Sequence, residues 1–335
     1  MSGGVDSSVT AALLQAAGHD VQGVTLRLWG GEADQGCCSV ADVEDARRVA
    51  DHLGLEHHTF NFGPDFDRHV VEPYVAAHAA GRTPNPCIEC NRHLKFDRLL
   101  ERADLLGFDA VATGHHARVV DRPDGTRRIA RGADGPKDQS YVLHMLDQAA
   151  LAQVLLPVGD LTKAEVRERA ADLGLRTAEK PDSQDVCFIQ TGAGRQGFLK
   201  SRIDLTPGRV LDDTGRQVGE VEAIELVTVG QRRGLGLRRQ QEPVFVTSVD
   251  VGTATVTIGR KEDLLDAAVA LDDLVWADGP VAGPVLVQCS AHGEPRPGVL
   301  AGSVLTWEAP QPRVAPGQSV VFYDADQVLG GALAR

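Results

Sequence analysis

The sequence contains no apolar run long enough to cross a membrane, and its first residues include neither a basic segment nor a hydrophobic signal segment. We therefore expect a cytoplasmic protein that does not interact with membranes. In that compartment, six cysteines are expected to be reduced thiols, catalytic groups or metal ligands rather than a disulfide scaffold. A net charge of −13 argues against broad nonspecific binding of nucleic acid, although local basic patches could still hold an RNA.

A glycine-rich loop, Ser2-Gly3-Gly4-Val5-Asp6-Ser7-Ser8, lacks the lysine of the Walker A pattern. SGGxDS opening a helix is the pyrophosphate-binding pattern of enzymes that split ATP into AMP and pyrophosphate. Its glycines let the backbone approach an anion, and the helix that follows presents free N–H groups. Without the lysine, release of intact pyrophosphate fits better than transfer of a terminal phosphoryl group. The loop therefore predicts adenylation chemistry, with Asp6 near the pyrophosphate and its Mg²⁺.

Strand and helix patterns alternate over residues 1 to about 195. We predict strands at Val21–Leu28, His57–Phe62 and Asp109–Thr113, and helices after Gly4, after Ser39 and over Asn91–Leu106. This alternation predicts an α/β fold with a doubly wound parallel sheet, in which the glycine-rich loop and Gly114 share one crevice. Such a loop normally leaves a central strand, and only Met1 stands before Ser2, so we expect the first strand to be missing from this sequence.

Short strands with turn signals replace this alternation from about residue 205. Examples are the alternating run Thr253–Ile258 and the runs near Val285–Gln288, Val304–Trp307 and Ser319–Tyr323. We expect a catalytic domain over residues 1–200, a small linking domain over 201–263 and an antiparallel β-barrel over 264–335.

Two cysteines that lie far apart in the sequence, Cys90 and Cys187, indicate sulfur chemistry. Cys90 ends the loop Thr83–Cys90, and if a helix begins near Asn91, its N-terminus would lower the thiol pKa and make Cys90 a nucleophile. Cys187 lies about a hundred residues further on, in another segment led by a proline. An adenylating fold with two such cysteines suggests that ATP activates an oxygen for displacement by sulfur. One cysteine would carry the sulfur, and the other would resolve the linkage.

Seven segments give the chain a resemblance to a known family. In this order they are similar to those of the tRNA-specific 2-thiouridylases, bacterial enzymes that place sulfur on the wobble uridine of certain tRNAs. The segments are SGGVDSS from Ser2, GRTPNPCIECN from Gly81, ATGHHA from Ala112, KDQSY from Lys137, KPDSQDVCFI from Lys180, GQRRGLG from Gly230 and PGQSVVFY from Pro316. The resemblance implies a doubly wound sheet of the PP-loop ATP pyrophosphatase type, a linking domain and a C-terminal barrel.

The resemblance also implies a role for each matching position. Cys187 would accept a persulfide sulfur from a cysteine desulfurase or a relay protein, and Cys90 would close a disulfide with it as sulfur is delivered. ATP would be held by Ser2, Gly3, Gly4, Val5, Asp6, Ser7, Leu26 and Gly114. The tRNA, through its anticodon loop, would be contacted by Asn85, Pro86, Cys87, His115, Lys137, Asp138, Gln139 and Gln318. The enzyme would work as a monomer, without a resident metal.

The sequence departs from the family at Cys87, where many members have an aspartate credited with acid/base help. Three other interpretations stay open. Cys87, Cys90 and Cys187 could ligate three irons of an iron–sulfur cluster. Another adenylating ligase would share the loop but leave the cysteines unexplained. An ATP-binding sensor would explain neither the cysteines nor the barrel.

Overall fold

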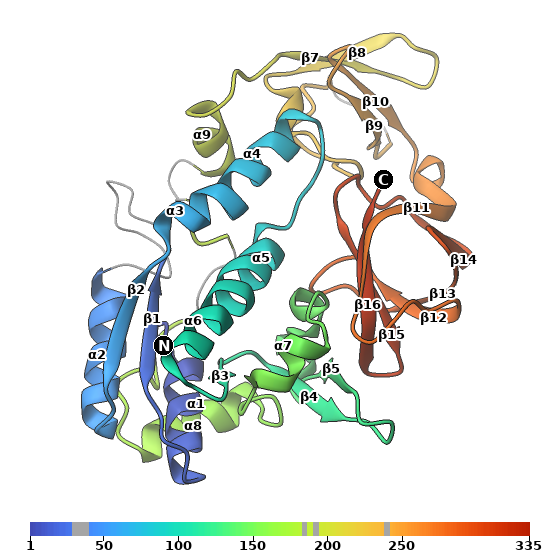
Figure 1. Ribbon diagram of the computed structural model, residues 1–335. Helices are drawn as coiled ribbons and strands as arrows, with labels where there is room; N and C mark the ends of the chain where they lie inside the picture. The colour runs from blue at the N-terminus through green and yellow to red at the C-terminus, as the bar shows by residue number, and fades with distance from the viewer. Residues whose placement is uncertain (29–39, 183–185, 190–193, 238–241) are drawn as a thin grey trace.

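The structure is a computed structural model that describes residues 1–28, 40–182, 186–189, 194–237 and 242–335. Figure 1 shows an α/β part at the N-terminal end of the chain, a small sheet in the middle and a barrel at the C-terminal end. Among the described helices, none is both long and apolar enough to cross a membrane. The predicted combination of an α/β fold with a following barrel is confirmed.

The α/β part contains two pairs of parallel strands. β1 (Gly23–Arg27) pairs with β2 (His57–Asn61), and β3 (Val111–Ala112) pairs with β6 (Val154–Leu155). Within the described residues the two pairs form separate sheets. Met1 lies beside β1, where its amino group donates to the carbonyl oxygen of Val24, and the Thr25 hydroxyl donates to the Met1 carbonyl at 2.7 Å.

Three helices pack together around the glycine-rich loop. They are α1 (Val5–Ala16), α2 (Val40–Leu53) and α8 (Lys163–Asp172). Val9 of α1, Val49 of α2 and Val166 of α8 are almost fully buried in one cluster. This packing brings the start of α8 to the start of α1, although the two lie far apart in the sequence.

A second helical layer carries the first pair of cysteines. α3 (Gly63–Phe66), a π-helical turn (Asp67–Val71) and α4 (Glu72–Ala79) form one helical run. α5 (Pro86–Glu89), a π-helical segment (Cys90–Arg98) and α6 (Leu99–Leu106) form the other.

The second run begins earlier than predicted. Asn85 caps it, with its side chain accepting from the Cys87 N–H, and Pro86 occupies the first turn. The predicted start near Asn91 is therefore wrong. Cys90 lies in the second turn, and because the helix-terminus effect fades after the first turn, that argument for its reactivity does not apply.

A hairpin that the sequence analysis did not predict joins the α/β part to the barrel. β4 (Ala117–Asp121) and β5 (Arg127–Arg131) are antiparallel, and β5 extends the barrel sheet through the pairing of Ala130 with Gln327. Short helices follow: 3₁₀ turns at Gly135–Lys137 and Ser140–Leu143, and α7 (Gln148–Gln153). The chain then passes through β6 and α8.

The middle of the chain forms a four-stranded sheet of order β8-β7-β10-β9. Helix α9 (Gly194–Lys200) precedes this sheet in the chain. Ile224 lies fully buried in the core of the sheet. The strands are β7 (Gly208–Leu211), β8 (Gln217–Val221), β9 (Phe245–Asp250) and β10 (Thr255–Gly259), with 3₁₀ turns at Ile224–Leu226 and Glu262–Leu264.

Six antiparallel strands close the C-terminal barrel. Its long strand β11 (Leu265–Trp276) pairs first with β14 and then with β16, with a bulge between Asp272 and Val275, so that no edge remains between these strands. Asp273, within the bulge, has a φ of 50°. The other strands are β12 (Gly283–Gln288), β13 (Arg296–Ala301), β14 (Val304–Pro312), β15 (Ser319–Asp324) and β16 (Gln327–Ala334).

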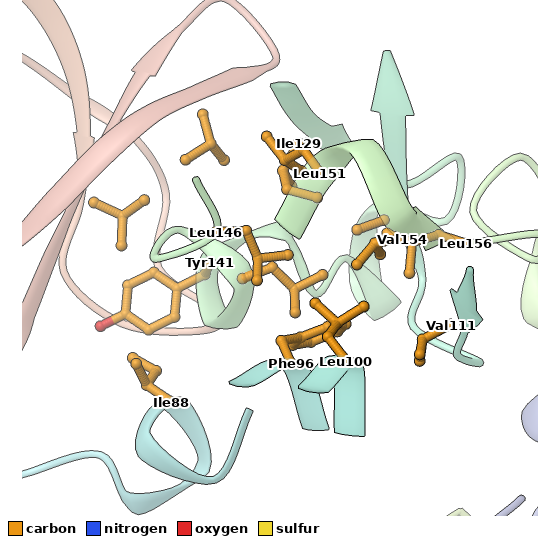
Figure 2. Packing of buried hydrophobic residues seen from close by; sticks show 14 of the residues in the cluster. Ile88, Phe96, Leu100, Val111, Ile129, Tyr141, Leu146, Leu151, Val154 and Leu156 are labelled. Carbon is orange, nitrogen blue, oxygen red and sulfur yellow. The ribbon is translucent and has the colours of Figure 1, made fainter. Parts of the chain in front are cut away.

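One apolar cluster fixes the second helical run, residues 86–106, against the barrel. This run carries Cys87 and Cys90 and is called the cysteine-bearing helix below. Figure 2 shows Ile88 and Phe96 of that helix facing Tyr141 and Leu146. The same cluster contains buried residues of β15, and the Tyr141 hydroxyl donates to the Ser319 carbonyl at 2.9 Å. The barrel therefore positions the helix through a shared core.

We expect Asp278→Ala to destabilise the junction between hairpin and barrel. Asp278 accepts from Arg128 at 2.8 Å and from Arg122 at 2.8 Å, and the Arg128 side chain is only 8% exposed. Removing the carboxylate leaves a buried guanidinium uncompensated, a loss of about 3–5 kcal/mol. The matched control is Asp121→Ala, whose pair with Arg127 is exposed and should contribute less than about 1 kcal/mol. Equal thermal midpoints for the two variants would contradict the assignment.

A second prediction concerns pH. Burial lowers the pKa of His144 to about 4, and its ring lies where a Cβ at Gly331 of β16 would sit. Because the folded pKa is below the ordinary 6.5, the neutral ring stabilises the fold above pH 6.5, and that contribution is lost as the pH falls toward 4. His144→Gln should reduce the fall in thermal midpoint between pH 7 and 4.5, while the exposed control His19→Gln should not. An unchanged slope in His144→Gln would sink this account.

Candidate functional site

The glycine-rich loop forms a tight turn at the start of α1. Gly3 has a φ of +70°, and a Cβ there would lie 2.3 Å from the Asp42 carbonyl oxygen, so this position requires glycine. The Ser7 hydroxyl accepts from the Ser2 N–H at 3.0 Å. The N-cap residue is Gly4, which has no side chain to cap the N–H groups of the first turn. The first-turn N–H groups of α1 are thus suited to bind an anion.

Gly114 lies against this first turn. A Cβ at Gly114 would be 2.7 Å from the backbone of Asp6 and Ser7, so the two segments are in direct contact. The prediction that the loop and Gly114 share one crevice is confirmed by this contact.

The Asp6 carboxylate joins three segments. It accepts from Lys163 Nζ at 2.8 and 2.7 Å and lies 3.1 Å from His116 Nε2. Burial alone would raise the pKa of Asp6, but the hydrogen bonds from His116 and Lys163 together lower it. Asp6 is therefore held ionised beside a lysine.

A second carboxylate, Asp182, lies next to the first. It accepts from Lys137 Nζ at 2.8 Å and from Arg167 at 2.8 Å, and Lys163 Nζ is 3.0 Å away. Burial acts to raise the pKa of Asp182, but the bonds from Lys137 and Lys163 prevail and hold it well below its usual range. The cluster thus contains three cations and two carboxylates.

One large cavity, of about 910 Å³, connects this ionic cluster with the cysteines. Lys163, His116 and Asp182 line it as well. The residues predicted from the sequence that line it are Ser2, Asp6, Ser7, Leu26, Pro86, Cys87, Cys90, Gly114, His115, Lys137, Asp138, Gln139 and Cys187. Those outside its lining are Gly3, Gly4, Val5, Asn85 and Gln318.

Two segments of the chain bring cysteines to this cavity. One carries Cys87 and Cys90, and the other carries Cys187. Cys87 and Cys90 come from the first and second turns of one helix, and both are partly buried. Cys187 is also partly buried, and the next residue, Phe188, packs edge-on against Phe66 and Tyr74. This aromatic contact anchors the segment that carries Cys187.

Several predicted tRNA contacts make protein contacts instead of projecting outward. His115 is 7% exposed and hydrogen-bonds Thr113 at 2.7 Å, and burial lowers its pKa well below the usual value, so it is neutral. Gln139 accepts from the His116 N–H at 2.9 Å.

Asp138 is enclosed by donors. Its carboxylate accepts from Arg131 at 2.7 Å, from the Gly132 N–H at 3.0 Å and from the N–H and hydroxyl of Ser140. Its side chain is only 7% exposed. Asp138 thus fixes the loop that carries Lys137 and Gln139.

Gln318 and Val5 lie away from the cavity. Gln318 belongs to a barrel turn in which the Pro316 carbonyl accepts from Thr83, next to the loop that leads to Asn85. Val5 is 3% exposed and faces the core between helices.

The sequence analysis missed Lys163 and His116. A signal for Lys163 was present, because Thr162-Lys163-Ala164-Glu165 is a capping box, and the structure forms both of its bonds. That pattern predicts a helix whose first residue is Lys163. His116 stands beside the predicted His115, and nothing in the sequence separates their roles.

Cys289 lies outside the cavity lining. Cys289 packs against the barrel core, and burial raises its pKa to about 12, as expected for a buried thiol. Cys37 and Cys38 lie outside the described residues.

Comparison with known proteins covers nearly the whole chain. Residues 1–191 match the family described as tRNA methyl transferase HUP domain, residues 196–260 its PRC-barrel domain, and residues 285–334 the aminomethyltransferase beta-barrel domain. A protein of Roseiflexus sp. (strain RS-1) named tRNA-specific 2-thiouridylase MnmA is 45% identical over 99% of this chain and 96% of its own length. Proteins of the same name from Chloroflexus aurantiacus (strain ATCC 29366 / DSM 635 / J-10-fl) and Thermobifida fusca (strain YX) are 45% and 44% identical, again over 99% of this chain and over 96% and 93% of their own lengths. The chain belongs to the tRNA-specific 2-thiouridylase family.

Proposed function

We propose that the chain catalyses ATP-dependent transfer of sulfur to C2 of a wobble uridine in tRNA, with AMP and pyrophosphate as co-products. The names of its relatives supply the reaction class. The observation that carries the proposal is that the glycine-rich loop, Cys90 and Cys187 line one cavity. Activation of an oxygen by ATP and its displacement by sulfur need an adenylation centre and thiols within reach of the same substrate.

The first step is adenylation of the base. The uracil O2 attacks the α-phosphorus of ATP as N3 gives up its proton to solvent. The bond between the α-phosphorus and the bridging oxygen breaks, so that pyrophosphate leaves. Ser2, Ser7 and the first turn of α1 would hold the phosphates, with Leu26 on the adenine side. Both oxygens of Asp6 accept from Lys163, so Mg²⁺ would enter with ATP, held mainly by phosphate oxygens.

The second step is sulfur transfer. The terminal sulfur of a persulfide on Cys187 attacks C2, and AMP leaves with the former O2. The Cys90 thiolate then attacks the Cys187 sulfur, forming a Cys90–Cys187 disulfide and releasing 2-thiouridine, whose N3 takes up a proton. An external thiol must reduce the disulfide before the next turnover.

The tRNA side of the proposal rests on residues of the cysteine-bearing helix, of the loop that carries Lys137 and of the barrel. Asn85, Pro86 and Cys87 form the first turn of the cysteine-bearing helix, and Lys137 and Gln318 are candidates for RNA contact. His115, Asp138 and Gln139 would position these groups from inside the protein. An anticodon base is single-stranded, so it can be flipped into a pocket at modest cost.

We assign the chemical steps and the binding of tRNA to different parts of the chain. We assign the chemistry to residues 1–200, and support of the tRNA to the linking domain over 201–263 and the barrel over 264–335. The chain would act in the cytoplasm as a monomer and receive sulfur from a cysteine desulfurase or a relay protein.

The iron–sulfur alternative keeps the substrate and changes the sulfur carrier. Cys87, Cys90 and Cys187 line the cavity, but in the described part of the chain no three His, Cys, Asp or Glu side chains are grouped as metal ligands. The persulfide route remains the proposal, and cysteine variants separate the two routes.

We expect Cys90→Ser and Cys187→Ser each to abolish 2-thiouridine formation while ATP binding stays within about twofold of the wild type, because neither thiol is assigned to the nucleotide. Cys87→Ser should be milder, since Cys87 would only line the base pocket. Nucleoside mass spectrometry of tRNA after reaction with ATP and a sulfur donor measures this. Cys289→Ser, in the barrel, is the control. Retention of 2-thiouridine formation by Cys90→Ser or Cys187→Ser would refute the two-cysteine mechanism. An equal loss of 2-thiouridine formation in these two variants and in Cys87→Ser would favour the iron–sulfur cluster.

We also expect Gly114→Ala to lower ATP affinity about 10-fold to 100-fold, because its Cβ would overlap the backbone of Asp6 and Ser7 and displace the phosphate loop. Gly135→Ala is the matched control, since a Cβ there meets no atom within 4 Å. The tRNA-dependent products should be AMP and pyrophosphate. Release of ADP, or equal affinity in both variants, would contradict the loop assignment.

A further inference from the structure

The glycine-rich loop has no lysine of its own, but the fold brings one to it. Lys163 Nζ lies 2.8 and 2.7 Å from the two carboxylate oxygens of Asp6, the residue that follows the loop glycines by two positions. The Lys163 side chain is 13% exposed and lines the cavity. A lysine ammonium group therefore lies at the first turn of α1, where the backbone N–H groups point out of the helix.

Lys163 is held in this place by its own helix. Thr162 caps α8 through a capping box, and the Lys163 N–H donates to Asp134 at 2.8 Å. Val166, one turn further on, is fully buried against Val9 of α1. The position of the ammonium group is thus determined by the backbone and by helix packing, as a preorganised binding group requires.

The contacts of Lys163 allow one of its donors to turn to a phosphate. A lysine ammonium has three donors; two face Asp6, and the third faces Asp182, 3.0 Å away. A phosphate oxygen can take the place of Asp182 as the third acceptor. Lys137 and Arg167 also pair with Asp182, so Asp182 keeps two cationic partners when Lys163 turns to a phosphate.

We propose that Lys163 is a catalytic residue that binds the β- and γ-phosphates of ATP and stabilises the departing pyrophosphate, with Asp6 and His116 orienting it. The inference rests on the proposed function, since it assigns a further group to the same adenylation step. Helix α8 would thereby supply the cation that Walker A loops carry within the loop itself. His116, at 3.1 Å from Asp6, keeps the carboxylate directed at Lys163.

The test uses the full chain and inorganic pyrophosphate as the probe. Lys163→Met should weaken pyrophosphate binding about 30-fold, the loss expected for one charge-assisted hydrogen bond, while AMP binding stays within about twofold. Lys163→Arg, which keeps the cation, should recover part of the affinity. Lys261→Met removes the same charge from an exposed position and should leave both affinities unchanged. Calorimetric titration measures all four proteins.

A purely structural role predicts a different pattern. If Lys163 only held the loop, Lys163→Met would also lose hydrogen-exchange protection at the amides of the first turn of α1, and pyrophosphate and AMP affinity would fall together. Either that result or unchanged pyrophosphate affinity overturns the proposal. Thiolation of tRNA is scored separately in the wild type. A wild type that binds pyrophosphate through Lys163 but forms no 2-thiouridine would refute the proposed function and leave this inference standing.

Discussion

The site depends on the interactions of the ionised Asp6 carboxylate with Lys163 and His116. This carboxylate joins the start of α1 to α8 through Lys163, and to the segment between β3 and β4 through His116. Both partners come from segments more than a hundred residues away, so the contact exists only in the folded chain. Their hydrogen bonds overcome the desolvation of a mostly buried carboxylate and keep it charged. A neutral Asp6 would release the lysine from the loop and leave its position unspecified.

The barrel is connected to this contact by polar bonds as well as by apolar packing. Gln288 of β12 accepts from Arg131 at 2.7 Å, and Arg131 stacks on Tyr323 of β15 and bonds to Asp138. Asp138 fixes the adjacent Gln139, whose side chain accepts from the His116 N–H. A continuous series of bonds therefore runs from the barrel to Asp6. Two parts that the sequence separates into domains share one set of positioning contacts around the cavity.

How far the sequence could predict this arrangement depends on the range of each interaction. Local signals correctly predicted a helix that ends at Leu106 and a strand within the alternating run Thr253–Ile258. The hairpin β4–β5 is a local pairing that the sequence analysis missed. Its attachment to the barrel and the closure of the barrel by β11 depend on β16, more than fifty residues away, and no local pattern specified that partner. Likewise, the loop residues were recognisable from spacing, whereas Lys163 gained its place only through helix packing. Asp138 is a different case, because the donors that enclose it, Arg131, Gly132 and Ser140, are neighbours in the sequence, and no spacing pattern marked them as its partners.

The earlier start of the cysteine-bearing helix changes how its thiols are understood. Asn85 and Pro86 begin the helix, so its positive end lies at Cys87 rather than at Cys90. A negative charge in the first turn of a helix is favoured, and the benefit fades beyond that turn. The first turn of the helix, which contains Cys87, is therefore the part in which the backbone favours a negative charge. Cys90, one turn later, owes its place instead to the helix that packs Ile88 and Phe96 into the core shared with the barrel. The structure thus separates a thiol in the helix turn that favours negative charge from a thiol whose position is fixed by packing.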